Sequence, residues 1–561
     1  MKFYHILILT IFSASSYGQD MKDYTGSWQG KVEEKSAFNL DITIKKEASG
    51  SSLFIISNEH EIINMKFQFS SKENIQLSLN DNLSFNGIVN NEQTEINGFI
   101  KSGLLLYHIK LTKKGTDFIG EWNILMIDYL KSQSLYLSIE NGSDDEYQAY
   151  PIFGDDRFTG TWCANFNKNN DTISFSDFKT GLQFKGLLKS SEILLSINLG
   201  NKAITKVSFE KTENDWIIGN LSTNRSSKIN DGWKLSANQL LLPKMENDIR
   251  SKELDKTESV IIAQNNEIIY ENYFSGFNAS IPHDMRSASK SISSAIVGLT
   301  IDKKLIKSTD QNIYKFLSDK YQNIKDSLKS KITIQSLLTM SSGLDAIDFG
   351  TKSNRKSSAI EDNYQMTRDW TKSILEAPMI NKPFTHANYG SANPHLLGVA
   401  VNSVVQEPLE LFIDRILLMP LGISNYIIQT DMSGEPYFGG GMYLTPRDML
   451  KFGQLYLNKG KWKNKRILSE KWVKKSLKNY LNLENTSDKN GYGYLWWHHT
   501  YSINGKEIKS IEARGAGGQY IFVIPKLKVV TVITSGNYRN KKGQQPEKIL
   551  EKYILPFLKK K

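Results

Sequence analysis

The chain has 561 residues, which is too long for one ordinary globular domain and predicts two to four domains. Hydrophobic residues make up 39% of it and aromatic residues 11%, and this composition excludes wholesale disorder. The formal net charge is +11, but the basic residues are spread along the chain, so no nucleic-acid partner is expected. Cys163 is the only cysteine, which excludes an intramolecular disulfide and a cysteine-based zinc site.

The first residues have the layout of a secretory signal. Lys2 supplies a positive charge, residues 6–12 form a short apolar run, and Ser16-Tyr17-Gly18 ends in small residues. We expect residues 1–18 to be a signal peptide cleaved before Gln19, and the mature protein to be exported to the periplasm or secreted. The apolar run is too short to span a bilayer and no later stretch reaches the required length, so no membrane span is expected.

Residues 19–235 consist of short segments in which apolar and polar residues alternate. Phe38 to Ile44 and Glu192 to Leu199 are two examples, and turns rich in Asn, Gly, Ser and Lys separate the segments. Alternation with a period of two and regular turn signals predict an all-β accessory region, either a barrel or a sandwich of antiparallel strands.

A weak internal repeat runs through this β-rich region. Tyr24-Thr-Gly-Ser-Trp28 is echoed by Phe158-Thr-Gly-Thr-Trp162, which is compatible with two units of about 20–135 and 150–235 or with one larger barrel. A Gly-x-Trp at the start of a strand favours a buried indole that closes the end of a barrel over a ligand site.

Residues 240–561 have a mixed α and β texture and form the second predicted domain. Residues 260–270 predict a hairpin that turns at Asn265-Asn266. A helix is expected from Ser287, further helices and loops follow, and residues 520–524 and 529–534 predict two paired strands. The expected architecture is an antiparallel sheet with helices packed against it, a helical insertion and a last helix over 545–558.

Ser287-Ala-Ser-Lys290 opens the apolar helix, and residues three apart share a face of a helix. A serine hydroxyl is a poor nucleophile until a neighbouring base removes its proton, and a desolvated lysine amine can be that base. The same spacing occurs at Ser176-x-x-Lys179 and Ser208-x-x-Lys211 in strand-like sequence, and at Ser353-x-x-Lys356 in a polar loop, so the spacing alone is weakly specific. The eight histidines show no metal-ligand spacing, and no metal or organic cofactor is expected.

Five segments in order raise the specificity of this signal. They are Arg286 to Ser294, Leu337-Leu-Thr-Met-Ser-Ser-Gly-Leu344, Pro383 to Ser391, Gly439 to Asp448, and Gly515-Ala-Gly-Gly-Gln519. Together they resemble the serine β-lactamase-like family, which includes class C β-lactamases, D-Ala-D-Ala carboxypeptidases, esterases and amide hydrolases. The resemblance covers roughly residues 245–560 and implies a β-lactamase-like (DD-peptidase) fold for this domain.

The resemblance also implies roles for individual residues. Ser287 would be the acylated nucleophile, Lys290 its proton acceptor, and Tyr389 a proton relay to the leaving group. A phenol held by a lysine ammonium is expected to have a lowered pKa. The oxyanion hole would use the backbone amides of Ser287 and Ala516.

Two departures from the family pattern concern the rest of the pocket. The family's Tyr-x-Asn is Tyr389-Gly-Ser391 here, and its Lys-Thr-Gly motif is missing from the corresponding segment, Glu512 to Gln519. Arg514 is a candidate for the lost positive charge, and Gly515 and Gly517 would allow the substrate to approach closely. Tyr494, Trp496 and Trp497 are expected mainly in the core, with an acyl pocket as the alternative.

We therefore expect an exported serine hydrolase that forms an acyl-enzyme with small-molecule ester, amide or peptide substrates. Loss of the Lys-Thr-Gly motif favours an esterase, amidase or peptidase over a strong β-lactamase. One alternative is a penicillin- or peptidoglycan-binding protein that is acylated but turns over slowly. The other is a carbohydrate- or lipid-binding protein that acts through the N-terminal β-region.

Overall fold

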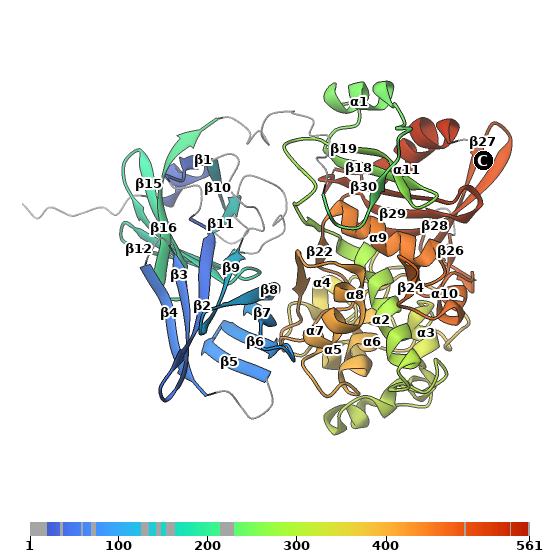
Figure 1. Cartoon of the computed structure of the whole chain (residues 1–561), viewed down its shortest axis with the longest axis horizontal. Helices are drawn as coiled ribbons and strands as arrows, with labels where there is room; N and C mark the ends of the chain where they lie inside the picture. The colour runs from blue at the N-terminus through green and yellow to red at the C-terminus, as the bar shows by residue number, and fades with distance from the viewer. Residues whose placement is uncertain are drawn as a thin grey trace, which may run out of the picture.

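A computed structural model describes residues 20–33, 37–57, 60–68, 74–124, 134–141, 147–152, 163–213, 229–486, 490–538 and 540–558. The predicted signal peptide and the second copy of the repeat, 158–162, lie outside these residues. The molecule has two lobes (Figure 1). We call strands β1–β16, drawn in blue and teal, the β-module, and the chain from β17 onward, drawn in green to red, the hydrolase part.

Two antiparallel sheets build the β-module. Alternate side chains of its strands are buried, as in β6 and β13, which is typical of sheets with one face in a core. The first sheet contains, in spatial order, β11 (Tyr147–Ile152), β10 (Ser134–Asn141), β1 (Gly26–Lys31), β16 (Lys202–Thr212), β15 (Glu192–Leu199), β14 (Leu182–Leu188), β13 (Thr172–Asp177) and β12 (Cys163–Asn169). In the second, β8 (Leu105–Lys114), β9 (Asp117–Asn123), β2 (Asn39–Glu47), β3 (Gly50–Ser57) and β4 (His60–Phe67) follow one another, and β7 (Glu95–Ser102), β6 (Leu83–Val89) and β5 (Asn74–Asn80) branch from β8.

The order of the strands mixes the two halves of the β-module. β1 pairs with β10 and with β16, so the first strand of the chain lies in the sheet that the later residues build. Trp28 on β1 is buried, stacks on Tyr24 and donates its indole N–H to the Tyr24 carbonyl over 2.8 Å. The indole thus serves packing, as the Gly-x-Trp pattern indicated.

A third, nine-stranded sheet forms the centre of the hydrolase part. Its order is β17 (Lys234–Leu235), β19 (Glu267–Tyr273), β18 (Thr257–Gln264), β30 (Val529–Ser535), β29 (Gln519–Ile524), β28 (Lys506–Gly515), β27 (Trp497–Ile503), β26 (Gly491–Tyr492) and β25 (Leu481–Asn482). The β18–β19 hairpin turns at Asn265 and Asn266, both with positive φ, as their residue types predicted. A small separate hairpin joins β23 (Lys461–Trp462) to β24 (Lys465–Arg466).

Helices cover both faces of this sheet. α1 (Pro243–Arg250) and α11 (Gln545–Ile549) share one core with its outer face. α9 (Pro446–Leu457) packs on the opposite face against β18, β29 and β30. The remaining helices are α2 (Lys290–Asp302), α3 (Ile334–Leu338), α4 (Glu361–Tyr364), α5 (Trp370–Glu376), α6 (Ala392–Asn402), α7 (Leu409–Ile413), α8 (Met419–Leu421) and α10 (Glu470–Ser476). The predicted fold class, an all-β region followed by a sheet with helices against it, is confirmed.

The two lobes share a sheet and exchange core residues. β21 (Tyr426–Gln429) of the hydrolase part pairs with β8, and β22 (Met442–Leu444) and β20 (His283–Asp284) extend that sheet. Phe99 and Leu106 of the β-module are buried in the hydrolase core, and Ile427 and Tyr443 in the core of the β-module. Among the described residues, none of the helices has the length and apolar character that crossing a membrane requires.

Candidate active site

Ser287 and Lys290 meet at the start of the central helix. Arg286–Ser289 form a turn of 3-10 helix that continues directly into α2. Lys290 Nζ donates to Ser287 Oγ over 2.7 Å and also to the carbonyl of Gly439. Lys290 is 1% exposed, whereas Ser287 is only half-buried. A buried amine therefore contacts a hydroxyl that remains reachable from solvent.

Tyr389 completes this cluster. Lys290 Nζ lies 5.1 Å from the centre of the Tyr389 ring, and the tyrosine is buried. Burial raises the pKa of Tyr389 above its ordinary value, although Lys290 and hydrogen bonding to Ser287 act in the opposite direction. The expected lowering of the pKa of this phenol is therefore wrong, because desolvation outweighs the nearby cation.

Asn485 holds the Tyr389 backbone in place. Its Oδ1 accepts from the Tyr389 N–H over 2.8 Å, and its Nδ2 donates to the Tyr389 carbonyl over 3.3 Å. The rings of Phe349 and Trp497 lie 5.3 and 5.1 Å from the Tyr389 ring. Sequence reasoning missed Asn485, because its partner is 96 positions away and no local pattern marks it.

The aromatic run before β27 divides between core and site. Tyr494 and Trp496 are buried among other aromatic rings of the core, as expected. Trp497 instead contacts Tyr389 and carries the Arg514 guanidinium 5.1 Å from its ring. One of the three side chains thus borders the cluster.

β28 lies against the turn that carries Ser287. A Cβ added to Gly515 at its end would lie 2.2 Å from the Met285 carbonyl oxygen and 3.1 Å from the Ala288 nitrogen. Ala516 is exposed in the next turn, and Gly517 has a φ of +81°. The absence of a side chain at position 515 is therefore what allows the strand to touch the Ser287 turn.

The other two predicted pocket residues are held by carboxylates. The Arg514 guanidinium is buried and forms ion pairs with Glu512 at 2.7 Å and Glu547 at 3.1 Å. The backbone N–H of Ser391 donates to Asp348 over 2.7 Å, and its hydroxyl is buried beside the same carboxylate. Among the described residues, no ion pair or hydrogen bond joins either side chain to Ser287.

The buried carboxylate of Asp348 lies beside the cluster of Ser287, Lys290 and Tyr389. Asp348 accepts from the backbone N–H of Ser391 and, over 3.2 Å, from that of Glu361, and its own N–H donates to the Tyr389 carbonyl. Burial and the neighbouring Glu361 raise the pKa of Asp348 to about 7, while Lys290 opposes them. Within the described ranges, no group of acidic, histidine or cysteine side chains could hold a metal ion.

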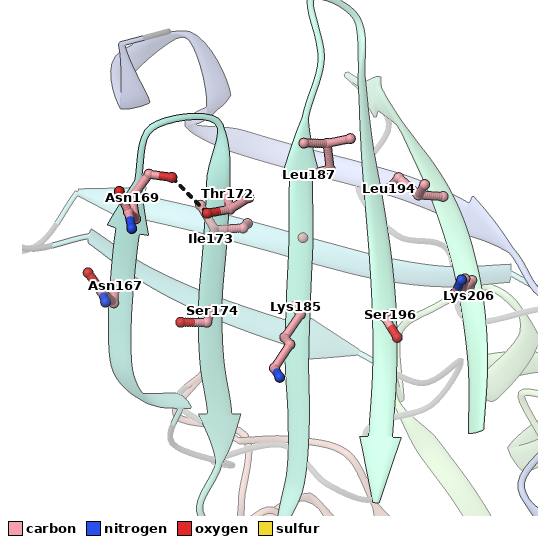
Figure 2. A pocket seen from close by; sticks show the side chains of 11 residues that line it. Asn167, Asn169, Thr172, Ile173, Ser174, Lys185, Leu187, Leu194, Ser196 and Lys206 are labelled. Atoms are coloured by element: carbon pink, nitrogen blue, oxygen red, sulfur yellow. Dashed lines mark hydrogen bonds between the residues drawn. The ribbon is translucent and has the colours of Figure 1, made fainter. Parts of the chain in front are cut away.

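The β-module carries a separate hollow of about 430 Å³. Figure 2 shows it on the surface of the first sheet, over β12–β16, with Ser174, Lys185, Ser196 and Lys206 pointing outward. It shares no lining residue with the Ser287 cluster.

Known proteins resemble part of this chain. The family model described as Beta-lactamase matches residues 256–551. The 6-aminohexanoate-dimer hydrolase of Paenarthrobacter ureafaciens is 22% identical over 288 residues, which are 49% of this chain and 71% of that protein.

Two solved structures show a weaker likeness. Simvastatin synthase from Aspergillus terreus has 16% identity and a TM-score of 0.46, and the match covers 56% of this chain and 97% of that one. A penicillin-binding protein from Bacillus halodurans has 16% identity and a TM-score of 0.42, covering 55% and 99%. Because the family model matches more than half of the sequence, the chain belongs to the Beta-lactamase family of serine β-lactamase-like hydrolases.

Proposed function

We propose that this protein is an exported serine hydrolase that forms an acyl-enzyme on Ser287 with ester, amide or peptide substrates. One observation carries the proposal: the amine of the buried Lys290 lies 2.7 Å from the hydroxyl of the half-buried Ser287. A nucleophile within hydrogen-bond reach of a base that other groups hold in place is the arrangement that covalent catalysis requires. Gly439 and Tyr389 supply those further contacts.

Acylation starts when Ser287 Oγ attacks the carbonyl carbon and gives its proton to the Lys290 amine, the proposed base. The C–O bond to Ser287 forms, and the carbonyl π electrons move to the oxygen. Ser287 N lies in the first turn of a helix, where amides have no partner within the helix, and can donate to this oxyanion. The Ala516 amide is the second proposed donor, since Gly515 brings this turn against the Ser287 turn.

The leaving group must receive a proton as its bond to the carbonyl carbon breaks. Tyr389 is suited to this step because burial raises the pKa of its phenol, which keeps the proton on the oxygen at neutral pH. Its proton passes to the leaving group and is replaced from Lys290. Water then attacks the acyl carbonyl carbon and its proton passes through Tyr389 to the Lys290 amine. The C–O bond to Ser287 breaks, Ser287 Oγ takes the proton back from Lys290, and the free acid is released.

The substrate class follows from what surrounds the cluster. The missing Lys-Thr-Gly motif and the paired Arg514 leave no equivalent cation directed at Ser287 among the described residues. This absence favours ester, amide or peptide substrates over the carboxylated ring of a β-lactam. The name of the Paenarthrobacter relative is consistent with amide hydrolysis.

Export rests on the charge, apolar run and small residues of positions 1–18. The test is the intact mass of protein recovered outside the cytoplasm. A mass that begins at Gln19 supports export with cleavage at that bond. Full-length protein found only in the cytoplasm contradicts it.

The catalytic proposal is tested with a p-nitrophenyl ester and, separately, a fluorophosphonate whose adduct is located by peptide mass spectrometry. We expect the label on Ser287 and loss of both label and turnover in Ser287→Ala. Ser353→Ala is the matched control, because Ser353 also stands three residues before a lysine, and it should keep both. Label on another residue, or turnover that survives in Ser287→Ala, contradicts the assignment. A label that forms without ester turnover favours the slow-turnover alternative instead.

A further inference from the structure

The β-module reaches the nucleophile turn through two of its own turns. Residues 102–104 join β7 to β8, and residues 177–181 join β13 to β14. The Leu104 N–H donates to the Lys179 carbonyl over 2.9 Å, and the Ser102 hydroxyl donates to the Thr180 carbonyl over 2.7 Å. Gly103 and Gly181 both have positive φ, and a Cβ on either would fall about 2.5 Å from the backbone of the other turn. The two turns therefore form one rigid unit.

This unit is ion-paired to the residues just before Ser287. Lys179 Nζ lies 3.3 Å from Asp284 Oδ2, with 9% and 1% of the two side chains exposed. Asp284 also pairs with Arg286 at 3.1 Å and accepts from its backbone N–H. Although burial acts against it, Arg286 and Lys179 together lower the pKa of Asp284. One buried carboxylate thus joins a cation of the β-module to the residue adjacent to the nucleophile.

Hydrogen bonds along the seam between the lobes hold these two turns in place against the hydrolase part. The Thr430 N–H donates to the Leu104 carbonyl over 2.7 Å, and Gln429 pairs with Leu105 where β21 joins β8. Farther along the seam, Asn86 donates to Glu410 over 2.7 Å. The position of the 102–104 and 177–181 turns relative to Ser287 is therefore set by strand pairing.

Between the lobes lies a small cleft of about 80 Å³. Its walls include Leu104, Phe178 and Lys179 from the β-module, and Arg286, Trp370 and Gln429 from the hydrolase part. Phe178 is 38% exposed and lines the cleft from the β-module side. Arg286 lines the cleft and directly precedes Ser287 in the chain.

We propose that the β-module forms one wall of the substrate site and that Phe178 determines which acyl groups the enzyme accepts. This inference rests on the proposed function of Ser287. The leaving group is assigned to the side of Tyr389, whose ring neighbours are Phe349, Tyr492 and Trp497, and the cleft is lined by a different set of residues. The cleft therefore takes the acyl side. Its apolar walls, Leu104, Phe178 and Trp370, can contact an acyl chain longer than an acetyl group, and the two cations in its lining, Lys179 and Arg286, are both paired with Asp284.

The test compares kcat/KM for p-nitrophenyl hexanoate with kcat/KM for p-nitrophenyl acetate in the full-length enzyme. In Phe178→Ala the hexanoate-to-acetate ratio should fall by about tenfold, because the lost apolar contact serves only the longer chain. Phe178→Leu should restore most of the ratio, since it keeps an apolar wall. Leu187→Ala is the matched control: Leu187 is 40% exposed on the same module but lines the hollow of Figure 2, and the ratio should stay at the wild-type value.

The outcomes separate this inference from the function on which it rests. If fluorophosphonate still labels Ser287 in Phe178→Ala and the hexanoate-to-acetate ratio is unchanged, Phe178 does not select the acyl group and the hydrolase proposal stands. If Leu187→Ala moves the ratio as much as Phe178→Ala, the effect is not local to the cleft and the inference is likewise overturned. If the wild-type enzyme neither takes the label nor turns over any ester, the hydrolase proposal itself fails.

Discussion

Burial and charge act on Tyr389 in opposite directions, and burial prevails. The Lys290 amine lies 5.1 Å from the ring, yet the pKa of Tyr389 is raised because the whole side chain is enclosed. A buried phenol keeps its proton until a stronger base forms beside it. In the proposed mechanism this makes Tyr389 the acid that protonates the leaving group, and during deacylation it relays the proton of water to Lys290.

Ionisation of the buried Asp348 should lower the free energy of unfolding as the pH rises. The pKa of its carboxyl is raised to about 7 by burial and by Glu361, whereas an aspartate in the unfolded chain titrates near pH 4. The folded protein therefore binds more protons than the unfolded chain between these values, and its free energy of unfolding should fall as the pH rises from about 4 to about 7. Asp348→Asn should remove this part of the pH dependence.

Urea unfolding of the wild type and of Asp348→Asn at about pH 5 and about pH 8 checks this expectation. The variant should gain stability relative to the wild type at the higher pH and lose that advantage at the lower one. Asp41→Asn is the control, because Asp41 is exposed on β2 and should leave the slope unchanged. Equal slopes for the wild type and Asp348→Asn would show that ionised Asp348 is not costly.

At the scale of elements, the contact between β28 and the nucleophile turn depends on a missing side chain. Gly515→Ala would place a Cβ 2.2 Å from the Met285 carbonyl oxygen, so the strand and the turn must separate. Overpacking of this kind costs about 1–3 kcal/mol, and here it would also displace the Ser287 and Ala516 amides from each other. We expect a lower free energy of unfolding and slower fluorophosphonate labelling of Ser287.

Gly543→Ala is the control for this change. A Cβ there would come no nearer than 3.9 Å to a neighbouring atom, the Gly517 nitrogen, so stability and labelling should stay close to wild type. If Gly515→Ala labels as fast as the wild type, the close approach of β28 does not shape the site. That result would also contradict the role of the Ala516 amide as an oxyanion donor.

Local signals predicted the elements, and distant contacts escaped prediction. The Asn265-Asn266 hairpin, the β29–β30 hairpin and the helix at Ser287 were foreseen because their turn residues and apolar pattern lie within a few positions of each other. The Ser287–Lys290 contact is of the same kind. Lys179 could not be connected to Asp284, since 105 positions separate them and their pairing depends on how β8 joins β21.

At the scale of the whole molecule, each lobe contributes residues to the hydrophobic core of the other. Ile427 and Tyr443 of the hydrolase part lie in the β-module's core, and Phe99 and Leu106 lie in the hydrolase core. Each lobe alone would expose these apolar surfaces and leave β8 and β21 with unpaired edges. The β-module is therefore built into the enzyme and not merely appended to it.

Ile427→Ala tests this shared core. Ile427 is fully buried and pairs with Tyr107 across the seam, so the truncation should lower the free energy of unfolding by about 2–5 kcal/mol. Because the seam belongs to both lobes, tryptophan fluorescence and far-ultraviolet circular dichroism should report one transition, shifted as a whole to lower urea concentration. Ile380→Ala, at an exposed loop position, should shift it by no more than about 0.5 kcal/mol. Two resolved transitions, only one of them moved by Ile427→Ala, would mean that the lobes unfold separately, and the β-module would then be a detachable wall.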